Sequence, residues 1–271
     1  MRNTNIDELL RMSQFELKNH LTSILEAYNY KTIIGDGYLL GTGNVVNTDV
    51  LLVAHLDTTL TLQGVKRQRV KHIFTHQMIK WSPEGIGGDD RCGCYAIIKI
   101  LETSKLRPMI LFVEDEEIGC VGTDKFCMSN DLSEIMYNKY IIEIDRRGSH
   151  DLVFYADVNI KWHKFCEKIT GWKEAFGSYT DICLLSEATG IASVNVSSGY
   201  YDEHTKFETI NMRNLCNTIK CVKKLLIASK NTNGFDYKEE IKNGSKCGNN
   251  VLDTYNPLAW SWYDSYRSTD K

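Results

Sequence analysis

The residues that could carry out chemistry are histidines and carboxylates that follow short apolar runs. His55 and Asp57 end the run LLVAHLDT, residues 51–58. Such a run is typical of a buried strand, and residues two apart on a strand share a face. A metal-binding histidine needs a nearby carboxylate to orient its ring. An ordinary histidine at a strand end fits the same pair, so this pair alone leaves both interpretations open.

Further apolar segments of the chain lead into similar groups. The polar residues that follow an apolar run or precede a helix are His55, Asp57, Asp89, Asp90, Glu116, Glu117, Asp145 and His204. An acidic pair on its own is usually a solvated surface feature. Several acids with two histidines in one chain indicate convergence on cations. Imidazole and carboxylate without thiolate suit catalytic zinc or a related divalent ion, and one carboxylate can bridge two such ions.

The composition is that of an ordinary globular protein with a sizeable core. The chain has 271 residues, 42% hydrophobic and 25% charged, which suggests one large domain or two small ones. The net charge of -3 gives no sign of nucleic-acid binding, and we interpret the basic stretch 66–71 as a solvated hairpin face.

The nine cysteines are irregularly spaced and include no CxxC pair. The first residues lack the apolar core of a signal peptide, and no stretch approaches the length of a membrane span. We therefore expect a reduced, cytoplasmic protein without a membrane partner, whose cysteines are small core residues.

The elements expected to position the polar groups alternate between helices and apolar strands. Helical patterns cover 5–28, 95–103, 160–169 and 211–229, a hairpin covers 31–41, and buried strands cover 50–54, 109–113, 140–144 and 191–196. Open α/β sheets bind ligands at the carboxyl ends of their strands. We therefore predict an α/β fold, in which a central, mostly parallel twisted sheet has helices on both faces. Residues 1–229 form the predicted catalytic domain, and 230–271 a polar extension with an aromatic cluster that is flexible or docks on the body.

Five ordered motifs resemble those of the co-catalytic dizinc exopeptidases, the superfamily of peptidase T, the bacterial leucyl aminopeptidases and glutamyl aminopeptidase. They are HLD at 55–57, GGDDRCG at 87–93, DEEIG at 115–119, Asp145 after its apolar strand, and GYYDEHT at 199–205. The resemblance covers roughly the predicted catalytic domain. It implies a zinc-exopeptidase fold and two divalent metal ions, with zinc expected and Co²⁺ or Mn²⁺ as alternatives.

The resemblance also implies a role for each matching residue. Glu116 would be the general base, Asp57 would orient His55, and Asp90 would either support the metal ligands or be structural. The implied metal ligands are His55, Asp89 as the bridge between both ions, Glu117, Asp145 and His204.

Other residues are candidates for contacts with a substrate. Tyr201 could hold an oxyanion, Arg146 or Arg147 a substrate carboxylate, and Thr180 could line the pocket. Each has a structural alternative, namely packing for the tyrosine, ion pairing for the arginines and helix capping for the threonine.

The chain departs from parts of the family in the spacing between its motifs. The segment from Asp145 to His204 leaves no room for the lid or dimerisation domain of peptidase T, and the segment from His55 to Asp89 is too short for the insertion of the glutamyl aminopeptidases. The layout resembles the single-domain aminopeptidases. The resemblance thus implies an aminopeptidase that acts on small peptides. A carboxypeptidase or N-acyl amino acid deacylase is the near alternative, and a catalytically silent peptide- or partner-binding protein is the alternative of another class.

Overall fold

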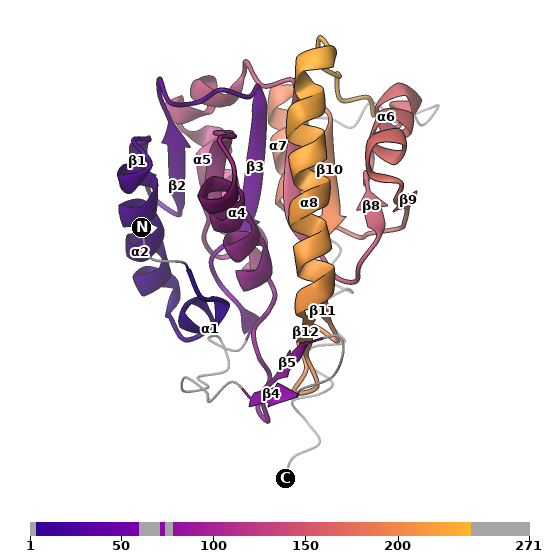
Figure 1. The fold of residues 1–271 in the computed structure, drawn as a ribbon. Helices are drawn as coiled ribbons and strands as arrows, with labels where there is room; N and C mark the ends of the chain where they lie inside the picture. The colour runs from indigo at the N-terminus through magenta and orange to yellow at the C-terminus, as the bar shows by residue number, and fades with distance from the viewer. Residues whose placement is uncertain (1–3, 60–70, 74–77, 240–271) are drawn as a thin grey trace. The chain divides into compact units, whose positions relative to one another are not determined.

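The main sheet of the computed structural model, which describes residues 4–59, 71–73 and 78–239, has eight strands in the order β1-β2-β6-β3-β7-β10-β8-β9 (Figure 1). Their bounds are β1 Lys31–Gly35, β2 Tyr38–Thr42, β3 Val50–His55, β6 Met109–Val113, β7 Tyr140–Arg146, β8 Asp151–Val153, β9 Lys173–Glu174 and β10 Ser193–Ser197. Strand β3 runs parallel to β6 and β7, and β10 runs parallel to β7. Strands β2 and β8 join this parallel centre in the antiparallel sense. The predicted fold class is therefore confirmed.

Side chains of β3 alternate between two hydrophobic cores, one on each face of the sheet. Val50, Leu52 and Ala54 belong to one core, and Leu51 and Val53 to the other. A strand that is buried on both faces has an uninterrupted apolar sequence for this reason. The first core is covered by α1 Ile6–Leu9, α2 Gln14–Ala27, α4 Arg91–Thr103, α6 Ile160–Thr170 and α8 Met212–Ala228, and the second by α5 Val121–Met128 and α7 Asp181–Thr189.

Side chains cap the starts of α2 and α4. Ser13 and Glu16 form a capping box at the start of α2. Helix α4 begins at Arg91, four residues before the predicted start at Tyr95, because the side chain of Asp90 accepts the backbone N–H of Gly93. The stretch 91–94, which contains Gly93, is thus the first turn of this helix.

A second sheet of four antiparallel strands has the order β11-β12-β5-β4. It consists of β4 Lys71–Ile73, β5 Ile79–Trp81, β11 Tyr200–Tyr201 and β12 Thr209–Asn211. Strand β4 pairs with β5. Residues 66–70 of the basic stretch, interpreted as a solvated hairpin face, lie outside the described chain. The pairing of β5 with β12 brings the segment before Asp89 beside the segment after His204.

The chain beyond α8 returns to the main body. The backbone N–H of Phe235 donates to the carbonyl oxygen of Lys139 at 2.9 Å, and the N–H of Ala192 donates to the carbonyl of Phe235 at 2.9 Å. Strand β8 is not an edge strand, because β9 pairs beyond it. The aromatic cluster of Tyr255, Trp260, Trp262, Tyr263 and Tyr266 lies outside the described residues, so the division at residue 229 stays a prediction.

The cysteines of the described residues are all free thiols, and Cys92, Cys94, Cys120, Cys166 and Cys221 are buried as expected of small core residues. Within the described part of the chain, no helix combines the length and the apolar character needed to span a bilayer. The cytoplasmic setting stays a prediction.

Candidate metal centre

The predicted ligands lie at the carboxyl ends of adjacent parallel strands and in two loops beside them. His55 ends β3, Glu117 follows β6, and Asp145 belongs to β7. Asp89 precedes α4, and His204 lies in the loop between β11 and β12. Because β6, β3 and β7 are neighbours with one direction, their carboxyl ends meet at one edge of the sheet.

Asp89 lies between the two histidines and contacts each with a different oxygen. Its Oδ1 is 3.0 Å from Nε2 of His55, and its Oδ2 is 3.1 Å from Nε2 of His204. Each histidine has a second carboxylate of its own. Oδ1 of Asp145 is 3.4 Å from the His55 nitrogen, and Oε2 of Glu117 is 3.0 Å from the His204 nitrogen. The site therefore consists of two donor groups that share Asp89.

The donor atoms fit divalent cations with nitrogen and oxygen ligands. Two donors that each lie about 2.0–2.1 Å from a tetrahedral zinc ion are separated by about 3.3 Å, which matches the spacing here. Ligand atoms of His55, Asp89 and Glu117 all lie within 4.8 Å of one another. Oε1 of Glu117 is buried without a hydrogen-bond partner, as expected of an atom available to a cation. Among described residues, the nearby thiol of Cys94 contacts the carbonyl oxygen of His55 instead.

Asp57 links the His55 ring to the turn that carries Glu116 and Glu117. Its Oδ1 lies 3.2 Å from Nδ1 of His55, which leaves the opposite ring nitrogen for the donor group. The two carboxylate oxygens accept the backbone N–H groups of Glu116 and Glu117, each at 3.0 Å. Burial favours a higher pKa for Asp57, but the contact with His55 and the two N–H groups outweigh it and lower the pKa. Asp57 is thus an ionised group that orients the imidazole of His55.

The nearby carboxylates stabilise the protonated, positively charged form of both histidines. Burial opposes the charged form of His55, but Asp145, Asp57 and Asp89 raise its pKa well above the ordinary value. His204 is similar, since burial is outweighed by Asp89 and Glu117, which raise its pKa to about 11. A divalent ion that replaces these protons is stabilised by the same carboxylates.

Glu116 lies in a short 3₁₀ turn, Glu116–Ile118, directly after β6. Its Oε1 is 3.7 Å from Sγ of Cys120. Burial raises the pKa of Glu116 well above its ordinary value, and the charges of Asp181 and Asp145 act in the same direction. A carboxylate with a raised pKa can accept and return a proton near neutral pH, as general acid–base catalysis requires.

Thr180 supports Asp145 and does not act as a helix cap. It occupies the N-cap position of α7, but its side chain makes no capping hydrogen bond. Its hydroxyl instead donates to Oδ2 of Asp145 at 3.4 Å. The backbone N–H of Asp145 donates to Oδ1 of Asn195 at 3.0 Å. These two contacts fix the side chain and the backbone of Asp145.

The two neighbouring tyrosines of β11 have different surroundings. The hydroxyl of Tyr201, the predicted oxyanion donor, accepts a hydrogen bond from the side-chain amide of Asn214 in α8 at 2.5 Å. Tyr200, which sequence reasoning did not select, donates to the carbonyl oxygen of Asp145 and lies 3.2 Å from its Oδ1. The alternation of side chains along a strand places the buried Tyr200 on the ligand side.

Glu208 is a second residue at the site that sequence reasoning missed. Its carboxylate is 2% exposed and accepts the backbone N–H groups of Gly87, Gly88 and Asp89. Burial and the nearby charge of Asp89 raise the pKa of Glu208 to about 8, and the three N–H groups oppose this shift. The only signal in the sequence is its place four residues after His204, directly before a short strand.

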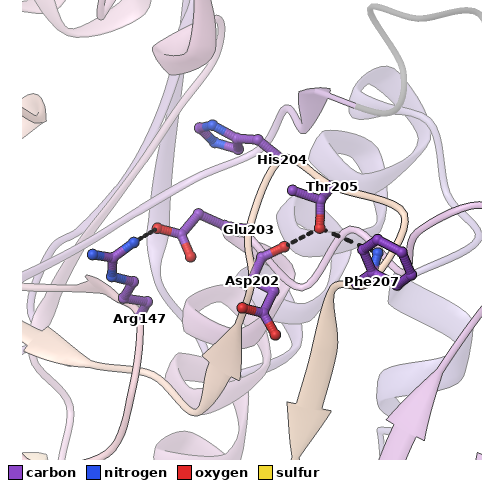
Figure 2. A pocket seen from close by; sticks show the side chains of 6 residues that line it. All are labelled: Arg147, Asp202, Glu203, His204, Thr205 and Phe207. Atoms are coloured by element: carbon purple, nitrogen blue, oxygen red, sulfur yellow. Dashed lines mark hydrogen bonds and ion pairs between the residues drawn. The ribbon is translucent and has the colours of Figure 1, made fainter.

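A pocket of about 520 Å³ adjoins His204 and is lined by Arg147, Asp202, Glu203, His204, Thr205 and Phe207 (Figure 2). Nη1 of Arg147 donates to Oε1 of Glu203 at 2.7 Å. The other candidate arginine, Arg146, does not line this pocket, and its Nε lies 3.6 Å from Oδ2 of Asp151. Strand β7 ends at Arg146. Successive side chains of an extended chain face opposite ways, so Arg147, and not Arg146, lies beside the loop that carries His204.

No family model and no curated protein matches the sequence. The structure is similar to the aminopeptidase PepT from Bacillus cereus, with a TM-score of 0.66 and 14% identity over 83% of this chain and 97% of that one. It is also similar to a tripeptidase from Staphylococcus aureus, with a TM-score of 0.65 and 13% identity over 84% and 97% of the two chains. A Zn-dependent exopeptidase from Parabacteroides distasonis gives a TM-score of 0.53 and 13% identity over 77% and 87%. The chain therefore has the α/β fold of these peptidases.

Proposed function

We propose that the protein is a metal-dependent hydrolase of peptide bonds and acts as an aminopeptidase on small peptides. The observation that carries this proposal is Asp89, whose two oxygens face His55 and His204 while each histidine has a further carboxylate. The shared fold supports it, because the similar structures include an aminopeptidase and a tripeptidase.

The residues present would hold two cations, zinc being the expected ion and Co²⁺ or Mn²⁺ the alternatives. His55, Asp89 and Asp145 would hold one ion, and Asp89, Glu117 and His204 the other. When bound, such ions lower the pKa of a water molecule and polarise the scissile carbonyl.

Glu116 serves as the general base in this proposal. Its carboxylate accepts the proton of the attacking water and returns it to the nitrogen of the leaving amine. Asp57 fixes the backbone of Glu116 and the ring of His55 with one carboxylate, so the base and the first ligand keep a constant relation. Such a proton transfer contributes about 10²–10⁴-fold to the rate.

The substrate binds beside His204 in this proposal. Arg147 is the arginine that lines the pocket, and its guanidinium can bind the carboxylate of a short peptide. Tyr201 remains a candidate oxyanion donor. Thr180 acts indirectly, through its contact with Asp145, whereas Arg146 lies beside Asp151.

Arg147 also favours one alternative within the same class. A carboxypeptidase or N-acyl amino acid deacylase recognises a free carboxylate next to the scissile bond, and an arginine beside a metal ligand suits that task. The presence of Glu116 on the ligand turn weighs against a silent binding protein, which has no use for a general base.

The test is cleavage of a small peptide library by zinc-loaded protein whose metal content is measured by elemental analysis. We expect two zinc ions per chain and release of the N-terminal residue from free peptides only. Cleavage of N-acetylated peptides would favour the deacylase or carboxypeptidase. Absence of turnover in a fully loaded protein would leave only peptide binding.

A further inference from the structure

Glu208 is a buried carboxylate whose partners are backbone groups of the segment that ends in Asp89. Its Oε2 accepts the N–H of Gly87 at 2.7 Å. Its Oε1 accepts the N–H groups of Gly88 at 2.8 Å and Asp89 at 3.0 Å. Three consecutive peptide groups are therefore held by one side chain.

Packing acts on the same segment from the same side. A Cβ atom at Gly88 would lie 2.8 Å from Cγ1 of Ile210 and 3.1 Å from Cβ of Tyr200. The backbone can approach the β11–β12 hairpin this closely only because residue 88 is glycine. The close approach brings its N–H within reach of Glu208, which directly precedes β12.

Burial of a carboxylate is costly unless hydrogen bonds replace its water shell. Three N–H donors meet this need at Glu208, and a charge-assisted bond to a backbone N–H is stronger than a neutral one. A carboxyl group offers acceptor oxygens on two sides, so this one side chain reaches the N–H groups of three consecutive residues. Glu208 therefore fixes the backbone at the position of Asp89.

We propose that Glu208 is a positioning residue of the metal centre, which fixes the backbone of Asp89 so that its two carboxylate oxygens face His55 and His204. This inference rests on the proposed function, because it takes Asp89 as the ligand shared by two cations. Within the described part of the chain, Glu208 accepts hydrogen bonds from backbone N–H groups and touches no side-chain atom of the proposed ligands.

Glu208 also joins Asp89 to the loop that carries His204. Glu208 and His204 both lie between β11 and β12. A displacement of this loop therefore moves His204 together with Glu208, which holds the backbone of Asp89. The cation held by His204 and Glu117 would therefore depend on Glu208 through two ligands, His204 and Asp89. The cation held by His55 would depend on it through Asp89 alone.

The test is zinc binding by the full-length Glu208→Gln variant, followed by calorimetry and by elemental analysis after desalting. A glutamine keeps the shape, but its NH₂ group faces a backbone N–H, so at least one of the three hydrogen bonds is lost. Loss of a residue that supports a metal ligand lowers metal affinity by about 10–100-fold. We expect a loss of this size for the more weakly bound zinc, and recovery of kcat with unchanged KM when zinc is raised.

Glu102→Gln is the matched control. Glu102 also accepts a backbone N–H, that of Thr4 at 2.8 Å, and lies at the far end of α4 from the site. Its substitution is expected to lower stability without changing zinc affinity.

Wild-type zinc affinity in folded Glu208→Gln would overturn the proposal, whatever the peptidase activity. If that variant does not fold, zinc affinity is measured for Glu208→Asp instead. The same loss is expected, because a side chain one methylene shorter cannot reach all three N–H groups. Zinc binding that weakens in the variant of a protein without peptidase activity would uphold this inference and reject the proposed function, so the two failures are distinguishable.

Discussion

Oδ1 of Asp57 accepts the backbone N–H of Glu116 at 3.0 Å and lies 3.2 Å from Nδ1 of His55. One oxygen thus sets the place of the proposed base and the orientation of the first ligand. The substitution Asp57→Asn replaces one acceptor by a donor, so it disturbs the ring contact or a backbone contact. We expect zinc affinity and kcat to fall by about 10–100-fold. Calorimetry and steady-state kinetics measure this, with Asp36→Asn, whose side chain is 83% exposed, as the control.

Glu116→Gln separates proton transfer from metal binding. The amide cannot accept a proton, whereas the backbone N–H that contacts Asp57 is unchanged. We expect kcat to fall by about 10²–10⁴-fold while the zinc content stays at the wild-type value. Glu114→Gln is a suitable comparison, because Glu114 pairs with Lys18 and is not part of the donor set. Turnover that survives in Glu116→Gln would show that another group acts as the base.

Asp89 and Asp90 are adjacent acids with different tasks, and conversion of each to asparagine distinguishes them. Asp89→Asn weakens a ligand that faces both histidines, so both zinc ions are expected to be lost. Asp90 caps α4 by accepting the N–H of Gly93, and asparagine caps as well as aspartate. We therefore expect Asp90→Asn to keep its zinc and to change the free energy of unfolding by less than about 1 kcal/mol. Loss of zinc from Asp90→Asn alone would reverse the two assignments.

The metal-free and zinc-loaded proteins are expected to respond to pH in opposite ways. The pKa of His204 is raised from 6.5 to about 11, so its pairing stabilises the metal-free fold fully below pH 6.5 and is lost as the pH rises towards 11. Burial and the charge of Asp89 raise the pKa of Asp145 from 3.8 to about 8, which adds a destabilisation that grows as the pH rises through this range. Zinc affinity instead increases with pH, because protons compete for the same donors.

Urea unfolding with a chelator, at successive pH values from 6.5 upward, tests the first part of this prediction. Zinc titrations in buffers of different ionisation enthalpy test the second, since the released protons contribute to the measured heat. A metal-free protein that gains stability with increasing pH would contradict the raised pKa values of His204 and Asp145.

Substitution of each arginine tests the assignment of the pocket. Arg147→Gln removes a charged donor from the wall beside His204, and a hydrogen bond to a charged group contributes about 1.5–3 kcal/mol. We expect KM to rise by roughly tenfold or more for peptides with a free C-terminal carboxylate, and to stay constant for amidated peptides. A larger effect of Arg146→Gln would favour the other candidate arginine.

Much of the fold is encoded in patterns that sequence reasoning can detect. Strand β3 is predictable because its residues fill cores on both faces, so polar residues are absent until His55. The start of α4 was misplaced because its first turn contains Gly93, which lowers helix propensity, and the cap at Asp90 overrides that preference.

Site residues that directly follow a strand could be predicted from the sequence. Site residues in loops that fold back onto the site could not. His55 and Asp145 follow apolar runs, whereas the choice of Asp89 over Asp90 came from the family resemblance. Glu208 lies in a polar segment, and an acid there resembles a solvated residue until the backbone of Gly87 and Gly88 is seen to donate to it. Such contacts depend on tertiary structure and cannot be predicted from a local sequence pattern.

The pairing of β5 with β12 has a consequence for how the protein reaches its native state. Gly88 and Glu208 are 120 residues apart, and the second sheet forms only when these distant segments meet. Closure of a long chain segment is entropically unfavourable and slows folding. We expect the parallel strands to assemble first, with His55 and Asp145 at their ends, and the hairpin around His204 to dock later. Acquisition of full zinc affinity during refolding would then report the last long-range step, well after helix signals have reached their final value.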